Sequence, residues 1–136
     1  MLTENVPAHI SAAALYTGLL IVMAIVLQFR VIRMRRSKKI GIGDGKDHDL
    51  ARAIRVHANF AENVPFALAG MAMLALIGAP ASVIHGVGLL TLIGRILHAV
   101  GLTSSAGSSF GRVAGMLMTF GALIVMALAL IVRAIW

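Results

Sequence analysis

The chain has 136 residues, enough for one domain, and 60% of them are hydrophobic while only 12% are charged. A soluble domain carries roughly 25% charged residues, so this composition excludes an ordinary soluble fold and favours a membrane protein. The net charge of +7 comes mainly from nine Lys and Arg residues between Arg30 and Arg55, and the lack of cysteine excludes disulfides and thiolate metal sites.

Four apolar segments follow one another along the chain, each near the roughly 20 residues that a helix needs to cross a bilayer. Helices are expected because an isolated strand in lipid leaves its backbone groups unpaired. We predict helices at about residues 10–29, 47–77, 81–102 and 110–135. The last connections are short, which makes neighbouring helices antiparallel. The sequence therefore predicts an all-α, four-transmembrane-helix up-down bundle that forms one membrane domain over residues 1–136.

The first connection, residues 30–48, is predicted to be a polar loop that is basic at first and then rich in glycine. It carries seven Lys and Arg residues. A basic cluster between two apolar runs is better explained as a topology signal than as a nucleic-acid surface, so no nucleic-acid partner is expected. By the positive-inside rule, this loop is cytoplasmic and both termini are extracytoplasmic. Basic residues beside the first helix, such as Arg30 and Arg33, are expected to contact membrane lipids.

The second predicted helix carries a polar stripe along one face. Arg52, Arg55, Asn59 and Glu62 are spaced three, four and three residues apart, which places them within an arc of about 80°. A charged side chain at mid-bilayer costs roughly 2.5–3.5 kcal/mol, so these residues need partners. The stripe either binds a ligand or only holds the bundle together through Arg–Glu pairs.

Further polar residues gather near the same end of the bundle. Arg95 and His98 are one turn apart on the third helix, and Arg112 opens the fourth. This asymmetry suggests an anion-binding cavity that opens toward the cytoplasm, although His98 is equally suited to packing. We expect no metal site, because no second carboxylate accompanies the histidines.

Glycines recur every fourth residue across the start of the fourth predicted helix. Gly107, Gly111 and Gly115 form consecutive G-x-x-x-G steps. Small residues at this spacing allow membrane helices to approach closely, so we predict a packing surface there.

The stripe resembles the MAPEG family, the membrane-associated proteins in eicosanoid and glutathione metabolism. The matching pattern is Arg52, Arg55, Asn59, Glu62 and then Pro65. The basic, glycine-rich first loop and the length are similar to bacterial members, which implies a bacterial inner membrane. The resemblance implies a homotrimer of four-helix subunits with glutathione bound between them.

In this resemblance, Arg55 and Arg52 hold the carboxylates of glutathione, Glu62 holds its ammonium group, and Asn59 contacts the peptide. Asn63 and His98 complete the implied glutathione-binding set. Arg112 is the nearest counterpart of the family arginine that activates the thiol.

The chain departs from the family pattern at three positions. Asn63 follows Glu62 where the family often has tyrosine, and His98 and Leu102 replace tyrosines of the eicosanoid-making members.

The resemblance as a whole implies a membrane glutathione transferase or peroxidase-like enzyme that acts on lipophilic small molecules. One alternative is a non-catalytic relative that binds a lipid or a thiol. A small multidrug transporter is disfavoured, because the first predicted helix has no carboxylate.

Overall fold

The structure is a computed structural model that describes residues 6–105 and 107–136. These residues form four α-helices. In chain order they are α1 (Ala8–Lys38), α2 (His48–Leu76), α3 (Ala81–Ser104) and α4 (Phe110–Ile135). The predicted all-α class is confirmed, and the fourth helix has the predicted bounds.

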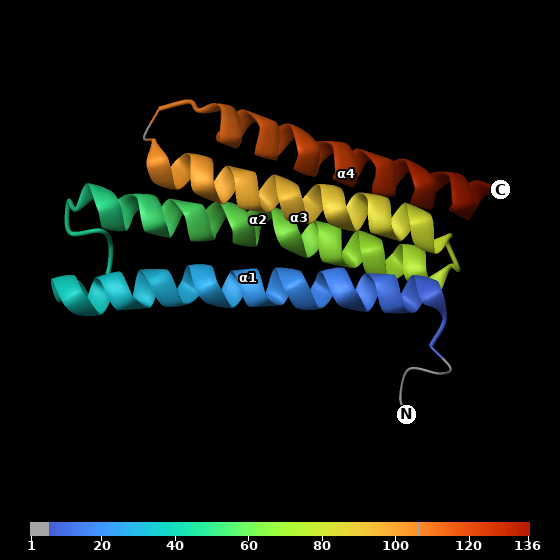
Figure 1. Cartoon of the computed structure of the whole chain (residues 1–136), viewed down its shortest axis with the longest axis horizontal. Coiled ribbons are helices and arrows are strands. Elements are labelled where there is room, and N and C mark those ends of the chain that lie inside the picture. The colour runs from blue at the N-terminus through green and yellow to red at the C-terminus, as the bar shows by residue number, and fades with distance from the viewer. Residues whose placement is uncertain (1–5, 106) are drawn as a thin grey trace.

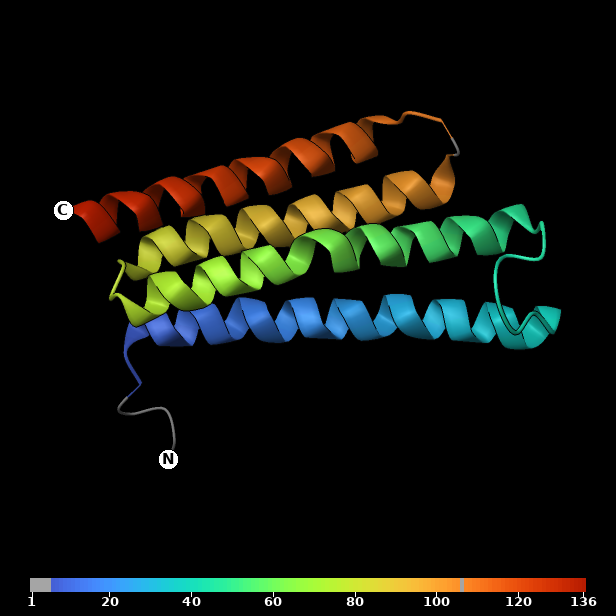
Figure 2. The ribbon, with the colours of Figure 1, turned by 180° about the vertical axis from the view of Figure 1, so that it is seen from behind.

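The four helices lie side by side along the long axis of the molecule and alternate in direction, as an up-down bundle requires (Figure 1). α2 and α3 lie between α1 and α4, which is also clear from behind (Figure 2). Within the described chain, α1 and α4 do not pack against each other, whereas α3 packs against all three other helices. The α1–α2 and α3–α4 connections lie at one end of the bundle, and the α2–α3 turn lies at the other.

The chain is an integral membrane protein. In the part of the chain that the structure describes, α1, α3 and α4 are long and apolar enough to cross a membrane. α2 has 29 residues and runs beside them, but it carries the polar stripe. Its inner face is apolar, and Leu50, Met71 and Leu74 are fully buried. The bundle therefore encloses a largely apolar core, and the exposed polar residues of α2 lie on its other faces.

The first helix is longer than predicted. It continues through the basic segment to Lys38 instead of ending at Phe29, so the loop is shorter than residues 30–48. Arginine, methionine and lysine favour helices, and cations near a helix C-terminus are stabilised by the helix dipole. The helix ends where Lys39 adopts the left-handed conformation, with φ of 56°. The end of the apolar segment was therefore a poor guide to the end of the helix.

The second helix begins at a side-chain cap. Asp47 accepts a hydrogen bond from the backbone N–H of Leu50 over 2.8 Å, which satisfies one unpaired donor of the first turn. Lys38 forms an ion pair with the same carboxylate. The hydrogen bond from Lys38, followed by the one from Leu50, lowers the pKa of Asp47 below its usual value. The carboxylate thus joins the end of α1 to the start of α2.

Glycines bring α3 and α4 into backbone contact. A Cβ atom on Gly115 would lie 2.4 Å from the carbonyl oxygen of Gly94, and one on Gly111 would lie 2.8 Å from the carbonyl oxygen of Leu97. The predicted packing surface is therefore present at Gly111 and Gly115. Gly107 is not part of it, because this residue lies in the connection before α4.

Replacing Gly115 with alanine is expected to destabilise the bundle by about 1–3 kcal/mol, because the added methyl group meets backbone atoms that cannot move aside. The control is Gly86→Ala, whose Cβ would meet no atom within 4 Å. Alanine favours helix by up to about 1 kcal/mol over glycine, so this control should be neutral or stabilising. Thermal unfolding of the detergent-solubilised proteins measures both changes. Equal stability of the two variants would contradict the close approach.

Candidate anion-binding site

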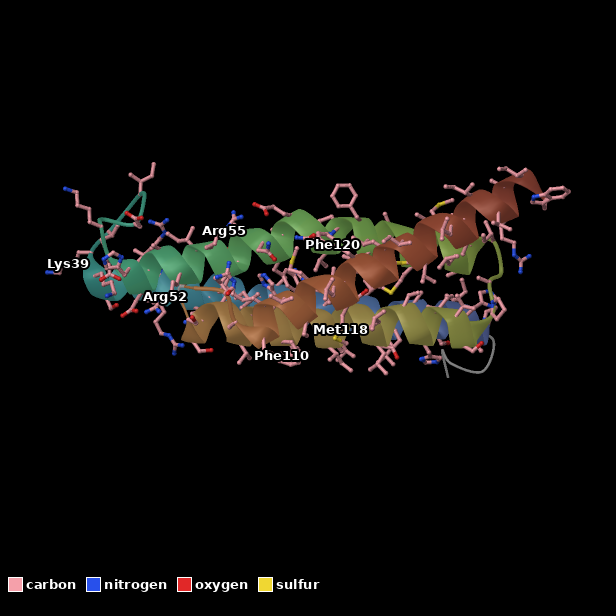
Figure 3. The ribbon with its side chains drawn as sticks, turned by 90° about the horizontal axis from the view of Figure 1, so that it is seen from above. Lys39, Arg52, Arg55, Phe110, Met118 and Phe120 are labelled. Carbon is pink, nitrogen blue, oxygen red and sulfur yellow. The ribbon has the colours of Figure 1, made fainter. Side chains whose placement is uncertain are left out.

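Three of the four stripe residues take part in ion pairs along α2. Arg52 Nη2 lies 2.5 Å from Asp49 Oδ1, and Arg55 Nη1 lies 3.3 Å from Glu62 Oε1. The side chains of Arg55 and Glu62 are 62% and 54% exposed. Figure 3 shows Arg52 and Arg55 on neighbouring turns of α2. Exposed ion pairs contribute little to stability, so both arginines can exchange their partners.

Asn59, the third stripe residue, turns toward the interior and contacts a buried arginine. Arg95 of α3 is only 1% exposed, and its Nη1 donates to Asn59 Oδ1 over 2.8 Å. Its Nε donates to Thr119 Oγ1 over 2.8 Å, and its Nη2 donates to the carbonyl oxygen of Gly115 over 3.2 Å. Arg95 has no ion pair within the described chain. One guanidinium therefore joins α2, α3 and α4.

Three arginines converge on a cavity between the N-terminal ends of α2 and α4. This cavity of about 400 Å³ is lined by His48, Ala51, Arg52, Arg55, Leu102 and Arg112. No carboxylate lines it, although Asp49 and Glu62 pair with two of its arginines from outside. Arg112 also donates to the carbonyl oxygen of Gly107. Planar guanidinium groups bind carboxylates and phosphates through paired hydrogen bonds, so the lining suits an anion.

A second cavity of about 400 Å³ shares Arg112 with the first. It is lined by Asn59, His98, Ser108, Arg112, Val113, Met116, Leu117 and Phe120. One wall is polar, and the α4 wall is largely apolar. Figure 3 shows Phe110, Met118 and Phe120 along this helix. A molecule with a polar head and an apolar body would therefore find both kinds of surface around Arg112.

The structure brings together five of the predicted site residues and leaves two outside the cavities. Arg112 joins Arg52 and Arg55 in the first cavity, and Asn59 and His98 in the second. Glu62 lies on the exposed face of α2, one turn beyond Asn59. Asn63 donates its amide N–H to the backbone carbonyl of Asn59 over 2.8 Å, which occupies it within the helix.

Arg95 is a buried polar residue beside the site that the predicted set of site residues did not include. Its position one turn before His98 was noted, but helical spacing alone does not identify a partner on another helix. The useful signal was an arginine that lies nine residues before the end of an apolar helix and has no acidic residue on that helix. Such a charge must be satisfied by neighbouring helices.

The polar groups of the site do not resemble a metal centre. No group of three His, Asp or Glu side chains that could hold a metal ion occurs within residues 6–105 and 107–136.

Comparison with known proteins gives consistent matches over nearly the whole chain. Residues 13–132 match the profile of the MAPEG family. The inner membrane protein YecN of Escherichia coli strain K12 is 33% identical over 117 residues, which cover 86% of this chain and 88% of YecN. The protein of the same name from Escherichia coli O6:H1 shows the same identity and coverage.

The Arg95–Asn59 hydrogen bond predicts energetic coupling between α2 and α3. We expect Arg95→Met and Asn59→Leu each to destabilise the bundle, and the double variant to lose less than the sum. The expected coupling is about 1–3 kcal/mol, because Asn59→Leu leaves the buried Arg95 without one of its acceptors and Arg95→Met leaves the half-buried Asn59 amide without its donor. Chemical denaturation in detergent measures it.

The control cycle combines Arg95→Met with Tyr16→Phe, because Tyr16 bonds His85 and not Arg95. This pair should be additive within about 0.5 kcal/mol. Additivity in the Asn59 cycle would contradict the coupling.

Proposed function

The chain belongs to the MAPEG family, and on that premise we propose that it is a membrane-bound glutathione transferase or peroxidase-like enzyme that acts on lipophilic electrophiles. The single observation that carries the proposal is the position of Arg112, which lines both the arginine-rich cavity and the cavity with the apolar wall. A polar thiol tripeptide and an apolar electrophile are the two substrates that such a pair of cavities suits.

Glutathione carries two carboxylates and one ammonium group, and the stripe offers groups of opposite charge. We assign its carboxylates to Arg52 and Arg55, which would exchange their present acidic partners for the ligand. Glu62, released by Arg55, would receive the ammonium group. Asn59 uses its amide oxygen to accept from Arg95, so its amide N–H is the group left for a peptide carbonyl.

The reaction requires a thiolate beside the apolar wall. A guanidinium near the sulfur favours the charged form and lowers the thiol pKa, and Arg112 is the residue assigned to this role. His98 lines the same cavity and is assigned to accept the thiol proton. The sulfur then forms a bond to the electrophilic carbon while the bond to the leaving group breaks, and the leaving group departs with its electron pair.

We also propose that the chain acts as a homotrimer. Glu62 lies at the midpoint of α2, beside helices that are long and apolar enough to cross a membrane. In a single copy, this half-exposed carboxylate and Arg55 would face lipid, which costs roughly 2.5–3.5 kcal/mol for an unshielded charge. A neighbouring subunit that covers this face removes that cost and encloses the site.

The basic residues at the end of α1 indicate the orientation of the chain in the membrane. The basic extension of α1 lies at the end of the bundle that carries the arginine-rich cavity. By the positive-inside rule we place this end in the cytoplasm and both chain termini outside it. A bacterial inner membrane agrees with the name of the relative, inner membrane protein YecN, and glutathione would then enter from the cytoplasm.

A non-catalytic protein that binds a lipid or a thiol is the second candidate. The observation in its favour is Leu102, which places an apolar side chain in the arginine-rich cavity where eicosanoid-making relatives carry a phenol. Binding needs only the arginines, whereas turnover also needs a group that activates the sulfur.

Purified protein is expected to bind glutathione and to conjugate it to chlorodinitrobenzene. Arg55→Ala should weaken glutathione binding by about 10–100-fold, because a hydrogen bond to a charged group contributes about 1.5–3 kcal/mol. Glu62→Ala should also weaken glutathione binding. Calorimetry measures the affinity, and absorbance of the conjugate measures turnover.

Arg133→Ala is the matched control, because this arginine is exposed at the far end of α4. It should leave the affinity unchanged. Binding without turnover would favour the second candidate, while no binding would overturn the glutathione assignment. Binding that is insensitive to both Arg55→Ala and Glu62→Ala would overturn the position of the site.

The mass of the solubilised assembly tests the trimer. Native mass spectrometry should give three chains per particle. The double variant Arg55→Ala with Glu62→Ala should keep that mass, because we expect apolar contacts to dominate the interface. A particle of one chain that still turns over glutathione would contradict the shared site.

A further inference from the structure

The cations at the end of α1 fall into two groups. One group is used within the chain: Arg30 donates to Thr103 Oγ1 over 2.7 Å, Arg35 to the carbonyl oxygen of Gly43 over 2.8 Å, and Lys38 pairs with Asp47. The other group consists of Arg33, Arg36 and Lys39. These three side chains are exposed and have no hydrogen bond or ion pair within the described chain.

Within the described chain, the acids near the end of α1 form no ion pair with the second group. Asp47 is bound to Lys38, and Asp44 accepts the backbone N–H of Lys46 over 2.9 Å. No ion pair joins either acid to Arg33, Arg36 or Lys39 within the described residues. The end of α1 therefore presents uncompensated positive charge at its surface.

This charge continues the exposed apolar face of α1. Val22, Val26 and Phe29 are each about 60% exposed. At about 100° per residue, Arg33 and Arg36 fall with them inside an arc of about 80°. Arg33 lies about 6 Å beyond Phe29 along the axis, and Arg36 about 10 Å. Arg33 therefore lies at the depth of the headgroup band, which adds about 5–8 Å on each side of the hydrocarbon core, and Arg36 lies just outside that band.

A cavity lies beside this exposed face of α1. It has a volume of about 400 Å³ and is lined by Ile32, Arg35, Arg36, Lys39, Ile40 and Gly41. Arg35 is held by its hydrogen bonds to the carbonyl oxygens of Gly41 and Gly43, so the loop and the helix form one wall. Two isoleucines beside three cations suit a group that is anionic at one point and apolar next to it. Figure 3 shows Lys39 at the end of the molecule, beyond Arg52 and Arg55.

We propose that this cavity binds the headgroup phosphate of an anionic phospholipid, with Arg36 and Lys39 as its cationic contacts. Arg33 lies one turn nearer the bilayer and contacts the same headgroup layer, while the acyl chains follow Val22, Val26 and Phe29. A zwitterionic lipid carries a compensating ammonium group, and free phosphate has no acyl chains for the apolar face. The site selects for both negative charge and acyl chains, and it is separate from the two cavities at α4.

Native mass spectrometry of the full chain in a neutral detergent tests the proposal, with dioleoyl phosphatidylglycerol and dioleoyl phosphatidylcholine as probes. The wild-type protein should retain phosphatidylglycerol in preference to phosphatidylcholine. Arg36→Gln with Lys39→Gln should lower the phosphatidylglycerol affinity about tenfold or more, because each cation near an anionic surface contributes to the attraction. Arg36→Lys with Lys39→Arg keeps both charges and should retain the lipid.

The matched control is Lys46→Gln with Arg133→Gln, which removes the same charge from exposed positions outside the cavity. It should bind phosphatidylglycerol as the wild type does. Equal loss in the control pair would overturn the site and leave only a general effect of net charge. Equal retention of the two lipids, or displacement of phosphatidylglycerol by millimolar inorganic phosphate, would overturn the lipid assignment. Loss of the lipid in the charge-preserving variant would overturn the role of charge.

Discussion

The buried guanidinium of Arg95 is the constraint on which the arrangement of α2, α3 and α4 depends. A charge within a membrane bundle costs several kcal/mol unless hydrogen bonds satisfy it, and Arg95 has no carboxylate partner in the described chain. Its acceptors are an amide oxygen on α2 and a hydroxyl and a carbonyl oxygen on α4. These acceptors satisfy the charge only together, so the rotation of α3 is fixed relative to both neighbours. The close approach of Gly94 and Gly115 makes the carbonyl oxygen of Gly115 reachable.

The same hydrogen bonds position the two cavities. Asn59 and Met116 both contact Arg95, and both helices that carry them continue into the arginine-rich end of the bundle. α1 does not contact α4 within the described chain, and it reaches the site only through α2 and α3. A buried cation therefore supports a site whose own cations, the partly exposed Arg52 and the exposed Arg55, pair with acids on α2.

Sequence reasoning recovered the features that depend on a single helix. The stripe on α2 and the fourth helix follow from spacing and composition, and the structure contains them. Apart from the glycine packing surface at Gly111 and Gly115, contacts between helices were not recoverable. Spacing places Arg95 near His98, but only the packing of α3 shows that Arg95 points to Asn59 and Thr119. Hydropathy marks the end of an apolar segment, whereas backbone propensity ends a helix, which explains why α1 continues to Lys38. The roles of the site residues in binding stay predictions.

The Arg55–Glu62 pair determines what kind of ligand the stripe can accept. An anion alone would take Arg55 from Glu62 and leave a carboxylate near the middle of the bundle without a cation. A cation alone would leave Arg55 in the same position. A ligand that carries both an anionic and a cationic group replaces each partner of the broken pair, so no unpaired charge remains at that depth. The stripe therefore favours a zwitterionic ligand over a simple anion, and an amino acid or small peptide with a free ammonium group meets that requirement.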